Sequence, residues 1–127
     1  MFEATTNQIR IHVVPAYVPD QSDPDQNQYF FSYTIEIHNG GKLSVQLVSR
    51  HWIITDAHGK MEEVQGPGVV GQQPTLEPGE SFQYSSFCPL TTPTGSMEGT
   101  FLMMSGKGEK FEVKIPKFIL VEPAQYH

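Results

Sequence analysis

The sequence has 127 residues, a formal net charge of −6 and 38% hydrophobic residues, including eight Phe, five Tyr and one Trp. This length predicts one domain over residues 1–127, and so many bulky apolar side chains exclude a disordered polar chain. The negative charge disfavours a nucleic-acid partner, because a polyanion would meet a repulsive field.

Alternating apolar and polar residues predict strands along most of the chain. The first strand is expected over residues 9–13, with Pro15 and Pro19 marking an edge or a bend, because proline cannot donate to a sheet ladder. A polar loop over residues 20–27 follows. The clearest alternation covers residues 29–38 and ends in the turn signature Asn39-Gly40-Gly41.

The second half of the chain continues this pattern. Residues 43–57 form a long strand that is apolar on both faces in its middle, which predicts either a bulge that switches faces or a central position in a sheet. Shorter strands are expected over 60–64, 82–86, 97–103 and 111–115, with 118–120 either extending the last strand or forming a separate edge piece. About seven strands without a helical period predict an all-β antiparallel sandwich, immunoglobulin-like or fibronectin type III-like.

The cysteine content and the absence of long apolar runs bound the environment. Cys88 is the single cysteine, so no internal disulfide is expected, and between Phe87 and Pro89 it is predicted to be a small buried apolar residue. No stretch approaches the roughly 20 apolar residues of a membrane span. We therefore expect a cytoplasmic protein without a membrane partner.

One motif invites a nucleotide-binding interpretation. Residues 66–71, Gly-Pro-Gly-Val-Val-Gly, spell G-x-G-x-x-G, but Pro74 and Pro78 forbid the helix that a dinucleotide site needs after its glycines. Two interpretations remain open. Backbone N–H groups of the loop could bind an anion, with Arg50 or Lys60 supplying charge. Alternatively, the glycines only allow positive φ angles in a connection between strands.

Other chemistry-bearing residues do not form a recognised constellation. His51, Asp56 and His58 could sense a divalent cation, but no H-x-H or C-x-x-C pair is present, so no specific metal site is predicted. No serine sits in a G-x-S-x-G elbow, and the adjacent Glu62 and Glu63 diverge on a strand. We expect no catalytic residue and no cofactor, hence a protein that is not an enzyme.

Large apolar side chains are more numerous than one face of each strand can hide. Two interpretations stay open for them: core packing on both sides of a central strand, or an exposed patch that binds an unknown protein partner. The residues concerned are Phe30, Trp52, Phe87, Met103 and Met104.

Many separate segments together resemble one known family. They run across nearly the whole chain and include residues 49–57 (SRHWIITDA), 66–71 (GPGVVG), 76–79 (LEPG), 88–90 (CPL), 95–99 (GSMEG) and 111–116 (FEVKIP). This set resembles the bacterial ApaG family.

The resemblance implies a fibronectin type III-like sandwich and a link to cobalt and magnesium resistance. Related eukaryotic domains look like protein-interaction modules, and the glycines matched here by Gly66, Gly68 and Gly71 have been suggested to bind pyrophosphate or a nucleotide. The leading interpretation is a non-enzymatic protein-interaction domain whose link to metal resistance is indirect. The alternative is a protein that binds pyrophosphate or a nucleotide polyphosphate through the loop 66–71.

Overall fold

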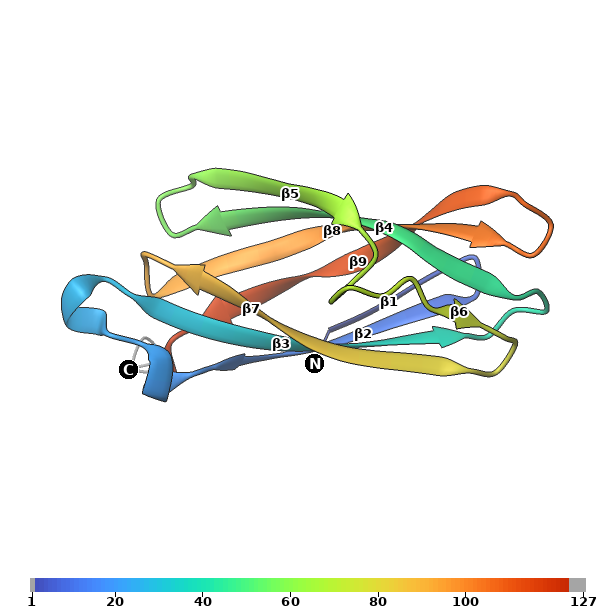
Figure 1. Cartoon of the computed structure of the whole chain (residues 1–127). Coiled ribbons are helices and arrows are strands. Elements are labelled where there is room, and N and C mark those ends of the chain that lie inside the picture. Colours follow the sequence, from blue (N-terminus) through green and yellow to red (C-terminus); the bar gives the residue numbers. More distant parts are fainter. Residues whose placement is uncertain (1, 124–127) are drawn as a thin grey trace.

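The computed structural model describes residues 2–123 and shows two antiparallel sheets stacked face to face (Figure 1). The predicted all-β antiparallel sandwich is therefore confirmed, while the finer likeness to fibronectin type III stays a prediction. The strands are β1 (Phe2–Thr6), β2 (Ile9–Tyr17), β3 (Tyr29–Asn39), β4 (Val45–Asp56), β5 (Met61–Pro67), β6 (Thr75–Leu76), β7 (Ser81–Leu90), β8 (Thr94–Ser105) and β9 (Lys110–Val121).

One sheet has the strand order β1-β2-β3-β7, and the other has β5-β4-β8-β9 with β6 also pairing with β4. Two short 3-10 helices, Pro19–Gln21 and Pro24–Gln26, lie in the loop between β2 and β3. Within residues 2–123, no helix has the length and apolar content needed to cross a membrane.

The number of strands and the end of β2 differ from the sequence expectation. Residues 2–6 and the two-residue β6 were not predicted, which gives nine strands in the described chain instead of about seven. At Pro15 an edge or a bend was expected; β2 continues through Pro15 to Tyr17 without ending there, and the edge interpretation agrees with the pairing. β1 pairs with β2 only as far as Phe2 and Val13, so no described strand lies beside Pro15 on that side. The N–H group that proline lacks therefore leaves no hydrogen bond unmade there.

The core lies between the sheets and follows the period of two. On β3 every second residue from Phe31 to Asn39 is buried, as the alternation predicts. The rings of Tyr33, Trp52 and Phe118 meet at its centre, with centroids 5.4 to 5.9 Å apart. Side chains from both sheets therefore interlock across the sandwich.

β4 carries the bulge that the mixed apolar pattern suggested. Its register with β8 shifts between Leu47 and Ser49, which leaves Val48 as the extra residue. Before the bulge the buried positions are odd-numbered, Val45 and Leu47, and after it the buried position is Trp52. A second register shift lies opposite Pro116, so residues 118–120 extend β9 and are not a separate edge piece.

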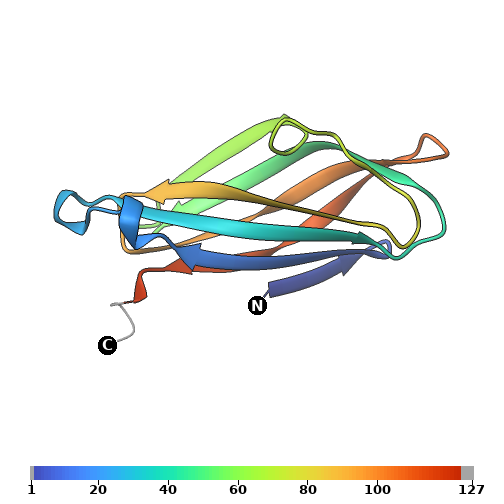
Figure 2. The ribbon, with the colours of Figure 1, turned by 60° about the horizontal axis from the view of Figure 1, so that its bottom comes forward.

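The two long sides of the sandwich are built differently. On one side β9 packs against β1 and β2 (Figure 2), and the Lys114 backbone N–H donates to Thr6 Oγ1 at 3.2 Å. On the other side β5 pairs only with β4 and β7 only with β3 among the described strands. This second side leaves an opening between the sheets, and the candidate site lies there.

Candidate functional site

The opening between β5 and β7 contains two hollows, of about 300 Å³ and 330 Å³, with four lining residues in common. We call this region the inter-sheet cleft. The shared residues are Tyr33, Arg50, Trp52 and Ser86. The glycine loop closes one end, and β7 residues up to Pro89 line the other.

The bulge at Val48 brings the charged member of the cleft to its place. Side chains alternate between the two faces of a strand, so the extra residue puts Arg50 on the same face as the buried Trp52. Without the bulge, the side chain of residue 50 would point to the other face of the sheet. Arg50 consequently reaches the edge of the cleft from a strand inside the sheet.

Arg50 holds the glycine loop by two backbone carbonyls. Its Nη1 donates to the oxygens of Pro67 and Gly68, both at 3.0 Å. The side chain passes over Gly66, where an added Cβ would lie 3.0 Å from Nη1. No carboxylate in residues 2–123 forms an ion pair with Arg50. The site thus contains a cation whose charge is not neutralised by a protein carboxylate.

The loop 66–71 is a tight turn tied to β4. Val70 and Gly71 have positive φ angles of 42° and 79°, and the Val69 N–H donates to the Gln72 oxygen at 2.8 Å. The Gly68 N–H donates to the oxygen of the bulge residue Val48 at 2.9 Å. Hence the Gly68 and Val69 N–H groups already have partners inside the chain.

The three predicted glycines meet different structural demands. Gly66 gives room to Arg50, and at Gly68 an added Cβ would collide with the Gln72 oxygen. Gly71 needs only its positive φ, since nothing lies within 4 Å of an added Cβ there. The expectation that Arg50 lies near the loop is confirmed. Lys60 instead lies before the opposite end of β5.

A buried hydroxyl in the cleft has no partner. Tyr84 is 7% exposed, and its Oη is the buried side-chain polar atom of residues 2–123 that lacks a hydrogen bond. Burial raises the pKa of Tyr84, with a smaller opposing effect from Arg50. Burial also raises the pKa of Tyr33, and a hydrogen bond with Ser86 lowers it in part. Both phenols are therefore protonated donors at neutral pH.

Cys88 lies at the other end of the cleft. It is 3% exposed, which confirms the prediction that it is a buried residue. Burial, with a contribution from the charge of Glu62, raises the pKa of Cys88 to about 11. The thiolate is the reactive form, so this thiol has little nucleophilic character at neutral pH.

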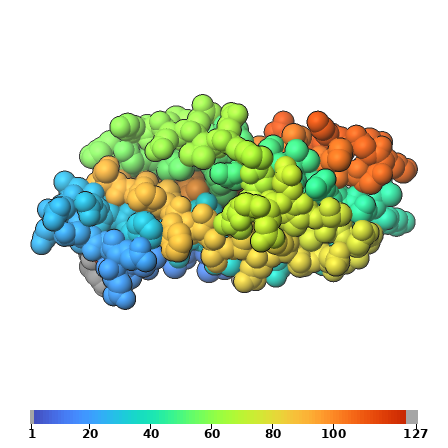
Figure 3. All heavy atoms as spheres, viewed as in Figure 1, coloured from blue at the N-terminus to red at the C-terminus, as the bar shows by residue number. Residues whose placement is uncertain are grey.

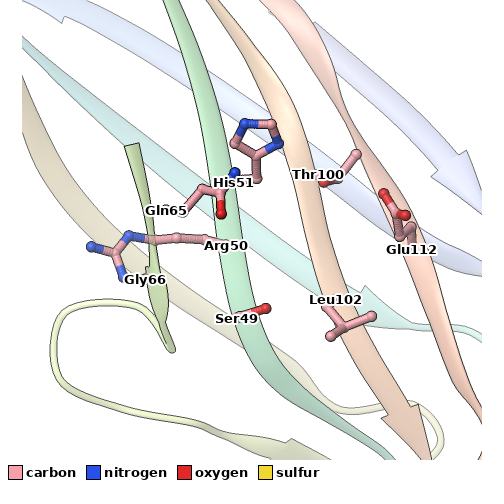
Figure 4. Close-up of a pocket in the computed structure, with 8 residues that line it drawn as sticks. All are labelled: Ser49, Arg50, His51, Gln65, Gly66, Thr100, Leu102 and Glu112. Carbon is pink, nitrogen blue, oxygen red and sulfur yellow. The ribbon is translucent and has the colours of Figure 1, made fainter. Parts of the chain in front are cut away.

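The outer face of the β5-β4-β8-β9 sheet has another hollow, of about 470 Å³ (Figure 4). In the close-up, Ser49 and His51 point to a different side of β4 from Arg50. His51 Nε2 lies 3.0 Å from Glu63 Oε1. The hollow is open, and no pair of its residues forms an arrangement typical of acid–base catalysis.

The residues considered for cation sensing are engaged elsewhere. Asp56 Oδ1 accepts hydrogen bonds from the backbone N–H groups of His58 and Lys60, both at 2.9 Å, and His51 pairs with Glu63. In the described part of the chain, no group of three or more His, Cys, Asp or Glu residues could hold a metal ion.

The predicted aromatic set divides between core and surface. Trp52 and Met103 are 3% and 1% exposed and belong to the core. Phe87 is 56% exposed, and its ring lies 5.2 Å from that of Phe30 on the neighbouring strand β3. Met104 lies on β8 of the other sheet. Phe30 and Met104 are half-buried, so Phe87 is the exposed member of the set, and we call it together with the neighbouring Phe30 the Phe30–Phe87 pair.

Comparison with known sequences agrees with the motifs. The sequence model of the ApaG domain matches residues 19–105. Protein ApaG of Beijerinckia indica is 54% identical over 97% of this chain and 95% of its own length. The chain belongs to the ApaG family. Protein ApaG of Dechloromonas aromatica is 52% identical over 96% of this chain and 98% of its own length.

Solved structures place the fold in the same family. The crystal structure of a Bordetella pertussis protein named ApaA superposes with a TM-score of 0.89 at 53% identity, covering 91% of this chain and 94% of that one. The C-terminal domain of wzt has a TM-score of 0.53 at 11% identity, covering 94% and 76%. That second likeness concerns the fold alone.

Sequence reasoning did not identify Tyr33, Tyr84 and Ser86 as neighbours of Arg50. Tyr84 and Ser86 stand on one face of a predicted strand, but that pattern is common to every half-buried strand. Their proximity to Arg50 depends on how the two sheets stack, for which no signal exists in the local sequence.

Proposed function

We propose that this ApaG-family chain is a non-catalytic binding domain that docks onto a partner protein through the Phe30–Phe87 pair and the adjacent free edge of β7. The observation that carries the proposal is the 56% exposure of Phe87, a large aromatic ring whose centroid lies 5.2 Å from that of the half-buried Phe30. Single exposed apolar residues are ordinary, but paired aromatics are typical of the centre of protein interfaces.

The surroundings of the pair extend the apolar surface. Tyr29, Phe30, Pro89 and Leu90 line a mainly apolar hollow of about 400 Å³ at the same end of β3 and β7. Atoms of β7, yellow to orange in Figure 3, reach the surface of that face. A partner side chain could enter this hollow while its neighbour covers Phe87.

The edge of β7 favours a partner that contributes an extended segment. β7 has ten residues without a charge, and it pairs only with β3 among the described strands. Long edge strands usually carry charged residues that prevent pairing with other chains. An uncharged edge with free N–H and C=O groups is suited to the addition of a strand.

The test compares Phe87→Ala with Ile119→Ala, which removes another exposed apolar side chain, 45% exposed, from β9. Both variants should keep their free energy of unfolding within about 1 kcal/mol, because neither residue is in the core. We expect Phe87→Ala alone to lose a partner that the immobilised wild-type chain retains from a cell extract. Equal retention by the two variants contradicts the proposal.

A second candidate function is the binding of pyrophosphate or a nucleotide polyphosphate at the loop 66–71. Arg50, which has no carboxylate partner in residues 2–123, favours it. Since the Gly68 and Val69 N–H groups are engaged, the contacts would come from Val70, Gly71 and the rest of the Arg50 guanidinium. Amide NMR titration with ATP and pyrophosphate should shift Val70 and Gly71, and unchanged spectra at millimolar ligand contradict it.

We propose that the link to cobalt and magnesium resistance is indirect and runs through the docked partner. Two observations support this assignment: the Asp56 carboxylate is already hydrogen-bonded to backbone N–H groups, and His51 is paired with Glu63. A cobalt titration of the isolated chain should then give only weak, scattered NMR broadening. Tight broadening confined to His51, Asp56 and His58 is the result that contradicts it.

A further inference from the structure

We infer that the inter-sheet cleft binds a small organic monocarboxylate with an apolar body, its carboxylate lying between Arg50 and the Tyr84 hydroxyl. This inference goes beyond the docking surface, because it assigns a small-molecule ligand to Arg50 and Tyr84, which are not part of the Phe30–Phe87 pair, although Phe87 also lines the cleft. It shares Arg50 with the polyphosphate alternative, but it differs from it in the ligand and in the use of the Tyr84 hydroxyl.

The first support is a donor without an acceptor. Tyr84 lines the 330 Å³ hollow, and its hydroxyl is buried without a hydrogen-bond partner among residues 2–123. A buried polar group without a hydrogen bond costs about 1–3 kcal/mol, so folded proteins rarely keep one without a reason. A ligand oxygen in the hollow would satisfy this hydroxyl.

The second support is a positive charge beside that donor. Arg50 lines the same hollow and lowers the pKa of Tyr84, which places its charge within electrostatic reach of the hydroxyl. One guanidinium nitrogen holds the Pro67 and Gly68 carbonyls, and no carboxylate of residues 2–123 neutralises the group. A charge-assisted hydrogen bond to an oxyanion is the interaction that this geometry offers.

The walls of the cleft indicate the rest of the ligand. The Tyr33 and Trp52 rings, 5.4 Å apart, line the cleft together with Arg50, and Val64, Met97 and Cys88 line its further part. Sites for small molecules typically combine such apolar walls with a few polar groups that fix orientation. The ligand therefore has an apolar body that covers the rings.

The charge balance favours a single negative charge. Arg50 is the one cationic side chain in the lining of these two hollows, and the Glu62 carboxylate lines the further part of the cleft. A polyphosphate would bring several negative charges to a single guanidinium, one nitrogen of which already holds two loop carbonyls. It would also approach the Glu62 carboxylate. A monocarboxylate matches Arg50 one to one and places its apolar end near Glu62 and Val64.

Trp52 is the chain's single tryptophan and lines the cleft, so its fluorescence can report on ligand binding at this site. The probes are cyclohexanecarboxylate and its neutral amide, which do not absorb at the excitation wavelength, and inorganic pyrophosphate. We expect a saturable change in Trp52 emission with the carboxylate and at least a tenfold weaker response to the amide. Equal responses to the carboxylate and the amide overturn the inference.

The decisive variant is Tyr84→Phe, which removes the hydroxyl and keeps the ring. It should weaken carboxylate binding roughly tenfold, the loss expected for one hydrogen bond to a charged group. The matched control is Tyr17→Phe, a half-buried tyrosine outside the cleft, which should leave the affinity unchanged. Carboxylate binding by Tyr84→Phe at the wild-type affinity overturns the inference.

Pyrophosphate separates this inference from the polyphosphate alternative. If pyrophosphate changes Trp52 emission at lower concentration than the carboxylate, the monocarboxylate assignment is wrong and the alternative gains support. A second variant, Arg50→Lys, keeps the charge but loses the fork that spans loop and ligand. It should weaken carboxylate binding, and an unchanged affinity counts against the proposed place of the carboxylate.

Discussion

The two long sides of the sandwich differ in whether the edges of the two sheets contact each other. On the β1–β9 side, Phe2 packs against Phe118 and the backbone of Lys114 bonds to Thr6, so the sheets close on each other. On the β5–β7 side the edges stay apart. Arg50, which has no carboxylate partner in residues 2–123, and Tyr84, whose hydroxyl has no hydrogen bond there, lie on this side. Closure supplies stability on one side, and separation leaves room for a ligand on the other.

The largest effect should come from breaking the closed side. Phe118 is fully buried and contacts the rings of Phe2, Tyr33 and Trp52. Phe118→Ala should lower the free energy of unfolding by about 3–5 kcal/mol, through lost burial and the cavity left behind. Urea unfolding measures this, with Phe87→Ala on the open side as the comparison. Equal losses for the two variants would mean that the sides do not differ in this way.

A smaller effect is expected in the loop that borders the open side. Gly68→Ala should cost about 3 kcal/mol, because a positive φ and a collision with the Gln72 oxygen act together. Gly71→Ala has the positive φ but free space, so it should cost about 1 kcal/mol. The two unfolding curves test whether the motif glycines are unequal, and similar midpoints would refute the assignment of their roles.

A further effect, which appears only at alkaline pH, concerns the open side. The pKa of Cys88 is about 11 in the folded chain against an ordinary value of 9.0, so the folded state keeps a proton that the unfolded state releases. Stability should therefore be full below pH 9 and fall as pH rises to about 11, by at most ~3 kcal/mol.

The control for this pH effect is Cys88→Ala, measured by urea unfolding at each pH. Its stability should fall less steeply between pH 9 and pH 11, although the raised pKa values of Tyr33 and Tyr84 act in the same direction at higher pH. Identical slopes for wild type and variant would show that the Cys88 thiol does not carry the effect.

Most strands could be predicted because a strand's period is local. Residues 29–38 alternate cleanly, and β3 covers them. The mixed pattern around Val48 predicted a bulge or a central position in a sheet; the register shift lies there, and β4 also lies between β5 and β8. β1 was missed because Phe2–Thr6 has few bulky apolar residues, and β6 because two residues carry no period.

The candidate site could be predicted only in part. Arg50 was expected near the loop 66–71, and its hydrogen bonds to Pro67 and Gly68 agree. The unpartnered Tyr84 hydroxyl could not be anticipated, because a tyrosine in a strand usually finds an acceptor when it is buried. Composition also could not show that Trp52 is buried in the core while Phe87 is exposed.

The sequence by itself determined the sandwich class, the positions of most strands, the bulge in β4 and the membership of the ApaG family. Each depends on local periodicity or on motifs within a few residues. Only the tertiary structure decided which sheet edges meet, which aromatics remain at the surface, and that Arg50, Tyr33 and Tyr84 share one cleft. These features depend on the stacking of two sheets from residues far apart in the chain, and local side-chain alternation does not encode that stacking.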